Sequence, residues 1–380
     1  MEPGADVAAW RDLCRRLEAV GDRLLQDDFP LDPADRAEGV AHLAEQLVCW
    51  LAWSISHNDP RSPAFQRQND LVTKWGGPNV DNVYRHARID ASLRYRITGH
   101  MHACEEFILA LRGGFMHMPT WGTLHEVTAS ELGIREGDAF EFELGGPDGI
   151  PIPTSAVMAT VREFYWDWRA EEPATFTIEC VDGPAAVRPR QQPDAVAAAL
   201  REAIDGVEQS IDYWNRYLID VRAATPDNSF APAMRLAKGL DAAAYAFCVY
   251  DLAPDEALVV ESDYLDAPYW SLQLASMAWF ESLDVVNRVM SLNHRQARRS
   301  DDGRLRVVVA HEDPGVPNWL DTEGRRTGLL TYRWFWSDVD PRPTTAVVRV
   351  DDIRSADIGG PERVAEIERR RQHIAWRFRT

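Results

Sequence analysis

The sequence predicts an α+β protein with a mainly antiparallel, sandwich-like β core, a pair of helices at the N-terminus and a long helix in mid-chain. Apolar residues at helical spacing near the N-terminus predict the pair, and the same spacing over residues 194–222 predicts the long helix. Short strand-like segments fill much of the remaining chain. Gly-Gly and Gly-Pro pairs separate several of them, as is typical of an antiparallel sheet or sandwich.

The length of 380 residues is large for a single core, so more than one module is expected. We expect an N-terminal helical region over residues 1–68 and a first β-rich module over residues 69–190. Residues 191–380 are expected to hold the long helix, a second β-rich module and a C-terminal helix.

The N-terminal pair consists of residues 5–29 and a second helix that starts at about Pro33. Asp32 is a suitable N-cap before a proline in the first turn. The apolar face of the second helix is broad enough to be buried against a larger body.

In the first β-rich module, Leu93, Tyr95 and Ile97 alternate with polar residues, which predicts a half-buried strand that ends at Gly99. Four further strand candidates follow, and they are residues 107–111, 139–144, 156–161 and 174–180.

After the long helix, the stretch to about Ala246 also has a helical pattern, broken by Pro226 and Pro232. Strands are then expected at residues 256–262, 269–277, 305–310, 328–336 and 346–350. The C-terminal residues 361–378 should form a helix. Its Glu and Arg residues stand at helical spacing, which favours a solvated face.

The composition argues against several classes of function. A net charge of -19, from 41 basic and 60 acidic residues, disfavours nucleic-acid binding, which needs a positive field. The five cysteines are scattered and contain no CxxC pair, which disfavours a disulfide framework and a cysteine-based zinc site. With neither a signal-peptide pattern nor an apolar run of about 20 residues, the expected setting is the cytoplasm, away from membranes.

Polar residues are concentrated around the strands of residues 291–336, where a scaffold often places its function. His311 and Asp313 stand at the end of the strand 305–310, and His294 precedes it. These three residues are the candidate catalytic groups, because histidine titrates near neutral pH and a carboxylate can accept a proton. The alternatives are that they pin the loop by hydrogen bonds or, less in keeping with the pattern, bind a metal.

A second set of residues could bind a substrate or ligand. Arginine forks bind carboxylate or phosphate groups, and tryptophan offers a flat surface. We expect residues 80–99 and 291–334 to meet around one pocket. The alternative for the arginines is an internal Arg–Asp network. The candidate binding residues are Asn82, Tyr84, Arg85, Arg96, Arg295, Asn318, Trp319, Asp321 and Arg333.

Two sets of motifs resemble a known family. The first is Asp81-Asn82, Tyr84, Asp90, Tyr95-Arg96-Ile97 and Gly99. The second is Tyr269-Trp270-Ser271, Ser282-Leu283-Asp284, Asn287, Ser291, the HEDPG of His311 to Gly315 and the NWLD of Asn318 to Asp321. Over about residues 69–350 the chain resembles the bacterial proteins of domain of unknown function 1214. The resemblance implies a mostly-β, sandwich-like core with appended helices, in a family whose biochemistry is largely unassigned.

The motifs of nucleotide hydrolases, Rossmann enzymes, α/β-hydrolases and zincins do not occur in the sequence. Because His, Asp, Asn and Arg residues converge near one strand end, we expect an enzyme without cofactor or metal, which applies acid–base chemistry to a small organic substrate with apolar and anionic parts. The alternative is a non-catalytic binding protein for a small apolar, sugar-like or anionic ligand. The sequence does not determine the oligomeric state.

Overall fold

The computed structural model describes residues 4–24, 32–67, 69–168, 172–183, 190–354 and 361–378. The chain divides into two compact units. Unit 1 holds residues 1–75, 83–164 and 174–216, and unit 2 holds residues 76–82, 165–173 and 217–380. The expected modules 1–68 and 69–190 thus fall in unit 1, apart from residues 76–82 and 165–173. Unit 1 also includes residues 191–216, which were expected in the third module.

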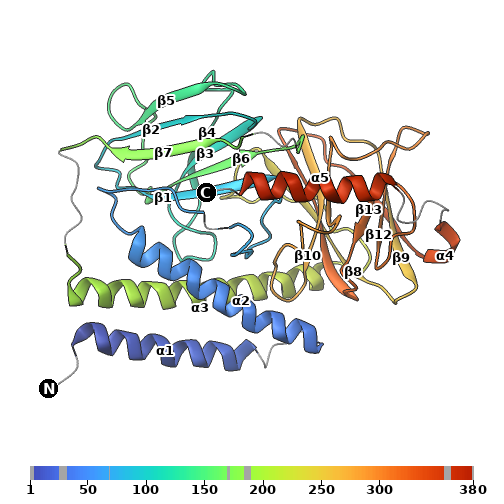
Figure 1. Cartoon of the computed structure of the whole chain (residues 1–380), viewed down its shortest axis with the longest axis horizontal. Coiled ribbons are helices and arrows are strands. Elements are labelled where there is room, and N and C mark those ends of the chain that lie inside the picture. The colour runs from blue at the N-terminus through green and yellow to red at the C-terminus, as the bar shows by residue number, and fades with distance from the viewer. Residues whose placement is uncertain are drawn as a thin grey trace. The chain divides into compact units, whose positions relative to one another are not determined.

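The helices of unit 1 are α1 (Ala5–Leu24), α2 (Pro33–Leu51) and most of α3 (Pro193–Ala224), and a π-helical turn, η1 (Ala52–Ser56), continues α2 (Figure 1). Asp32 caps α2 as predicted, since its carboxylate accepts from the Asp35 amide at 2.8 Å. The predicted end of the first helix, residues 25–29, lies outside the described residues.

Charged contacts and a close approach of two helices both contribute to the packing of these helices. Arg16 of α1 donates to Asp205 and Glu208 of α3 at 2.7 and 2.6 Å. Trp50 of α2 lies so close to Gly206 of α3 that a Cβ there would come within 2.6 Å of the indole ring. Glycine at this position therefore lets α2 and α3 approach each other.

Two antiparallel sheets complete unit 1. In the first, with strand order β1-β6-β3-β4, the strands are β1 (Asn82–Arg88), β6 (Met158–Phe164), β3 (Glu106–Arg112) and β4 (Thr123–Thr128). In the second, with order β5-β2-β7, they are β5 (Ala139–Leu144), β2 (Tyr95–His100) and β7 (Thr175–Cys180).

Unit 2 is a sandwich of two four-stranded sheets. The first, in order, is β11 (Ser291–Asn293), β10 (Tyr269–Ser276), β14 (Thr327–Phe335) and β8 (Ala243–Asp251). The second, in order, is β13 (Trp319–Asp321), β12 (Leu305–Ala310), β9 (Glu256–Ser262) and β15 (Thr344–Arg349). All these pairings are antiparallel except that of β12 with β13. Two helices follow, α4 (Val350–Ile353) and α5 (Pro361–Arg377).

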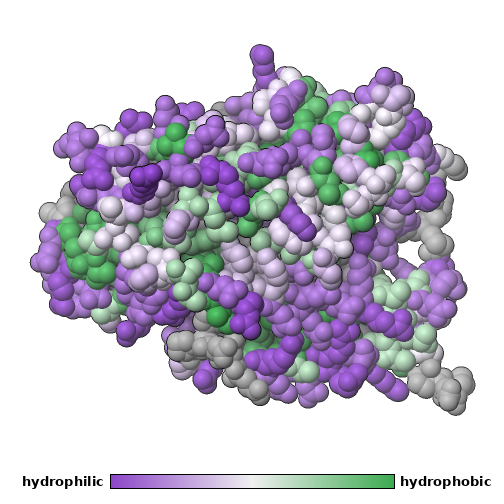
Figure 2. Space-filling model, turned by 180° about the vertical axis from the view of Figure 1, so that it is seen from behind, coloured by the Kyte–Doolittle hydropathy of each residue, from purple (hydrophilic) through white to green (hydrophobic). Residues whose placement is uncertain are grey.

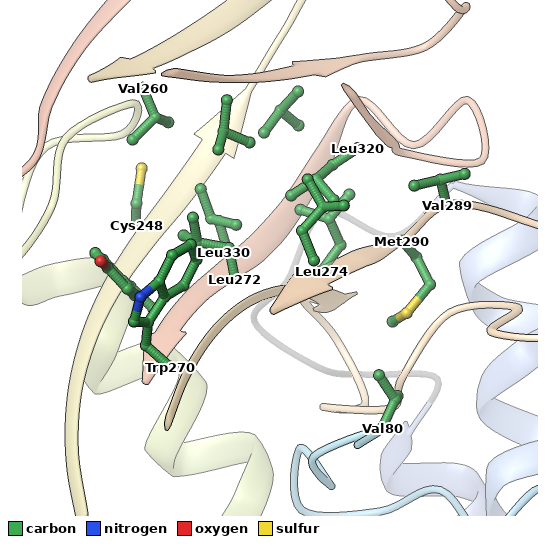
Figure 3. Close-up of a cluster of buried hydrophobic side chains, with 14 of the residues drawn as sticks. Val80, Cys248, Val260, Trp270, Leu272, Leu274, Val289, Met290, Leu320 and Leu330 are labelled. Carbon is green, nitrogen blue, oxygen red and sulfur yellow. The ribbon is translucent and has the colours of Figure 1, made fainter. Parts of the chain in front are cut away.

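The core of unit 2 lies between these sheets. Alternate residues of β10 and β14, such as Leu272 and Leu330, pack with Val260 of β9 and Leu320 of β13 (Figure 3). Ile374 of α5 belongs to the same cluster, so one face of this helix is part of the core. The face of the molecule seen in Figure 2 is mostly hydrophilic, with smaller hydrophobic groups between.

The predicted α+β class, with its sandwich-like core, helical pair and long helix, is confirmed. The helical pattern predicted up to about Ala246 is wrong beyond α3, because Ala243–Asp251 form β8 and pair with β14 along their full length. Pairing and burial in the sheet outweigh the helix propensity of this alanine-rich segment. The patterns of β1 and β4 gave no clear strand prediction.

Candidate functional site

A pocket of about 740 Å³ lies in unit 2 beside α5, and we call it the α5 pocket. Four segments contribute to it, namely residues 166–168, 292–298, 313–318 and one face of α5. The lining residues are Trp166, Asp167, Trp168, Leu292, Arg295, Gln296, Arg298, Asp313, Gly315, Val316, Pro317, Asn318, Glu362, Arg363, Glu366, Arg369 and Arg370.

The loop after β12 is shaped by Asp313 and held by α5. One Asp313 carboxylate oxygen accepts from the Gly315 amide at 2.8 Å, and Gly315 takes the positive φ of 74° that this turn requires. The other oxygen accepts from Arg363 Nε at 3.1 Å, and Arg363 also donates to the Val316 carbonyl at 3.1 Å. Arg363 therefore fastens one wall of the pocket to α5.

Asn318 has a structural part in the same wall. Its side-chain amide donates to the carbonyls of Arg298 and Arg306 at 2.7 and 2.9 Å, and its side-chain oxygen accepts from the Arg298 amide at 2.8 Å. These three bonds tie two loops to the end of a strand. The side chain predicted to bind a ligand is thus engaged with backbone groups.

His311 lies outside the α5 pocket. Its Nε2 is 3.3 Å from the Leu252 carbonyl oxygen, which can only accept, so Nε2 is the donor. In the neutral ring Nδ1 then accepts from the Thr322 hydroxyl at 2.7 Å. Both nitrogens are occupied by protein groups, which is the arrangement expected of a residue that pins the loop.

His294 lies behind Trp166, which together with Trp168 forms the aromatic wall of the pocket. Its ring meets those of Trp166 and Tyr269 edge to face, with centroids 5.7 and 5.8 Å away. Burial, aided by the charge of Arg295, lowers the pKa of His294 to about 4. The imidazole is therefore neutral at pH 7, and a base so weak is poorly suited to accept a proton at that pH.

Arg370 is the most buried arginine of the lining, with 2% of its surface exposed. Its guanidinium donates to the backbone carbonyl and the hydroxyl of Ser291, and it stacks 4.8 Å from the ring centroid of Trp168. Its Nε has no hydrogen-bond partner among the described residues. Burial lowers its pKa. The C-terminal helix thus buries Arg370, whereas Glu368, Arg369 and Arg371 lie on the solvated face that was expected.

A buried carboxylate that we had not predicted as a site residue, Asp81, lies behind the same wall. It accepts from Tyr269 Oη at 2.6 Å, Trp168 Nε1 at 2.6 Å and Asn293 Nδ2 at 3.0 Å. Burial raises its pKa, and the three donors oppose that shift. The only sequence signal for Asp81 was its place in the motifs that resemble the known family.

The other predicted residues of unit 2 do not line the pocket. Asp321 pairs with Arg288 at 2.9 Å. Trp319 is buried and donates from Nε1 to the Ala310 carbonyl at 3.1 Å. Arg333 is buried and donates to the Gly77 carbonyl at 3.2 Å. Asn82 is also buried in unit 2.

Three predicted binding residues, Tyr84, Arg85 and Arg96, belong to unit 1. Arg85 pairs with the buried Glu163 and donates to the Ala174 carbonyl at 3.0 Å. Arg96 of β2 reaches glutamates of the neighbouring strands β5 and β7. Both arginines thus pair within the protein, but with glutamates and not with the aspartates of the predicted Arg–Asp network. Arg162 lies over the Tyr84 ring at 5.0 Å.

Of the predicted catalytic and binding residues, the α5 pocket brings together Asp313, Arg295 and Asn318. Within the described ranges, no three His, Cys, Asp or Glu side chains form a group that could hold a metal ion. Among the same residues, no helix is long and apolar enough to cross a bilayer.

The chain is similar to solved structures of other proteins. An uncharacterised protein from Burkholderia cenocepacia matches with 30% sequence identity and a TM-score of 0.84 over 90% of this chain and 97% of that chain. The chain belongs to the family of this Burkholderia protein. A protein from Vibrio parahaemolyticus matches at 12% identity and a TM-score of 0.46 over 81% of this chain and 98% of that one, too low for any inference.

No protein-family model and no curated protein matches the chain. The resemblance to domain of unknown function 1214 therefore stays a prediction.

Proposed function

We propose that the protein binds a small organic molecule in the α5 pocket, and that binding rather than catalysis is its function. The observation that carries the proposal is the pocket itself. Its volume of about 740 Å³ is in the range of small-molecule sites, and its lining combines tryptophans with charged side chains. Such walls can hold an apolar body and orient a polar group.

The state of the predicted catalytic residues supports binding over acid–base chemistry. Only Asp313 lines the pocket, and both of its oxygens accept hydrogen bonds from the protein. His311 has both ring nitrogens bonded. The lowered pKa of His294 leaves it a weak base. His311 and Asp313 are therefore engaged by protein groups, and His294 is too weak a base to accept a proton readily at pH 7.

The proposal is tested with a pocket-filling variant. Arg295 lines the pocket, is exposed and has no side-chain partner among the described residues, so Arg295→Trp should obstruct the pocket without harming the fold. The matched control is Arg342→Trp, at an exposed arginine outside the lining.

We expect members of a panel of neutral, cationic and anionic ring compounds to raise the melting temperature of the wild type and the control. They should fail to do so for Arg295→Trp, because a ligand stabilises only the state that binds it. A panel without effect on the wild type, or with equal effects on both variants, would contradict the proposal.

We also propose that the protein works in a reducing compartment such as the cytoplasm. All five cysteines lie in the described residues, and no disulfide joins any of them. This is the usual state of a chain kept in a reducing environment. Fractionation of the source cells with an antibody to the chain tests this, and enrichment in an oxidising compartment would refute it.

A further inference from the structure

We infer that the ligand of the α5 pocket is an organic oxyanion, a carboxylate or a phosphate ester carried on a flat apolar ring. This inference rests on the function proposed above and names the chemical class of its ligand. It follows from the charges around the pocket, the surroundings of Arg370 and the aromatic wall.

The charges around the pocket favour an anion. Five arginines and four carboxylates line it, in a chain whose net charge is -19. Three of the carboxylates already pair with lining arginines, since Asp313 binds Arg363, Glu366 binds Arg363, and Glu362 binds Arg298. The fourth, Asp167, is exposed, where solvent and salt screen its charge.

Two of the five arginines, Arg295 and Arg369, have no acidic partner among the described residues. Their guanidinium groups can therefore turn to an incoming oxyanion without first breaking an ion pair. Both are exposed, so they attract an anion mainly by charge, and added salt should weaken that attraction.

Arg370 supplies the buried part of the site. It lines the pocket with 2% of its surface exposed, and its Nε has no hydrogen-bond partner among the described residues. Glu366, 3.7 Å away, and Asp81 favour its charge, and the opposing effect of Arg363 and Arg369 is smaller. An oxyanion that accepts from Arg370 would add a charge-assisted hydrogen bond in a buried place, where such bonds are strong.

The apolar part of the ligand has a wall to stack on. Trp166 is half-buried and lines the pocket, and the Tyr269 ring lies behind it at 6.2 Å and 27°. Trp168 is buried between His373 and Arg370, with centroid distances of 5.0 and 4.8 Å. It supports the wall from behind, so Trp166 offers the stacking surface. Rigid aromatic walls favour a flat ring, because little conformational entropy is lost when it binds.

The first test is a calorimetric titration of the full chain with four probes: 2-naphthoate, 2-naphthyl phosphate, methyl 2-naphthoate and acetate. At least one of the two ring anions should bind about tenfold or more tightly than the neutral ester and than acetate. Tighter binding of the phosphate identifies a phosphate ester, and tighter binding of the carboxylate identifies a carboxylic acid. If the neutral ester binds as tightly as both anions, the anion class is wrong although the pocket still binds a ligand.

The second test assigns the effect to the arginines. The double variant Arg295→Gln with Arg369→Gln should weaken binding of the preferred anion about tenfold and reduce its salt dependence. The control double variant, Arg342→Gln with Arg201→Gln, removes the same charge from exposed arginines outside the lining and should bind like the wild type.

A third variant, Arg370→Lys, keeps the charge but loses Nε and the planar fork, so it should also bind about tenfold more weakly. Its melting temperature reports whether it still folds. Equal losses in the control and the Arg295/Arg369 double variant would overturn the inference. If no ring probe binds, neutral or charged, and the wider panel also leaves the melting temperature unchanged, the proposed function itself fails.

Discussion

Replacing His117 by glutamine should flatten the dependence of stability on pH, because this imidazole is held neutral inside unit 1. Its ring lies against Trp50, Trp75 and Phe115, with centroids 4.9, 5.3 and 5.8 Å away. Neither ring nitrogen has a hydrogen-bond partner among the described residues. Burial, with a smaller effect of the Arg112 charge, lowers the pKa of His117 to about 3.

The sign and the size follow from proton linkage. The ordinary pKa of 6.5 applies to the unfolded chain, so between pH 6.5 and 3 the unfolded state binds a proton that the folded state does not. Stability should therefore fall as the pH drops through this window. For His117 alone, the loss between pH 7 and pH 5 is about 2 kcal/mol.

The assay is urea-induced unfolding, followed by tryptophan fluorescence, of the wild type and His117→Gln at pH 7 and pH 5. The difference in unfolding free energy between the two pH values should be smaller in the variant by about 2 kcal/mol. His125→Gln, at a half-buried histidine of β4, serves as the control. Equal pH dependence in the wild type and His117→Gln would show that the imidazole is not held neutral by its burial.

Three further predictions concern the packing. His311→Ala should lower stability by about 1–3 kcal/mol, because it removes two ring hydrogen bonds. Binding of 2-naphthoate should persist, so loss of binding in a calorimetric titration of an undestabilised variant would contradict the pinning role. Arg363→Ala should lower stability by about 2–3 kcal/mol, since it leaves Asp313 without its guanidinium partner; a urea midpoint equal to that of the wild type would contradict this. Gly206→Ala should destabilise by about 1–3 kcal/mol despite the helix preference of alanine, because the new Cβ lies 2.6 Å from the Trp50 ring; a raised melting temperature would exclude that clash.

Local pattern was sufficient wherever burial and backbone pairing act on a simple repeat. The apolar run Leu305–Ala310 predicted β12 at its exact bounds, and the spacing of three and four predicted α3 to within two residues at each end. The N-cap Asp32 was readable because capping needs only a side-chain oxygen and an amide three residues away. From such local rules the α+β class could be predicted.

The tertiary structure decided which charged and polar side chains meet. Arg370 and Glu366 stand at a spacing that reads as a solvated helix face, yet Arg370 is buried against Trp168. Asp81 is far in sequence from the three donors that surround it. His311 occupies the strand end where a catalytic group was expected, and one of its ring nitrogens donates a hydrogen bond to the Leu252 carbonyl. A strand or a helix is specified by neighbours a few residues away, whereas a binding site depends on side chains brought together by the packing of distant segments.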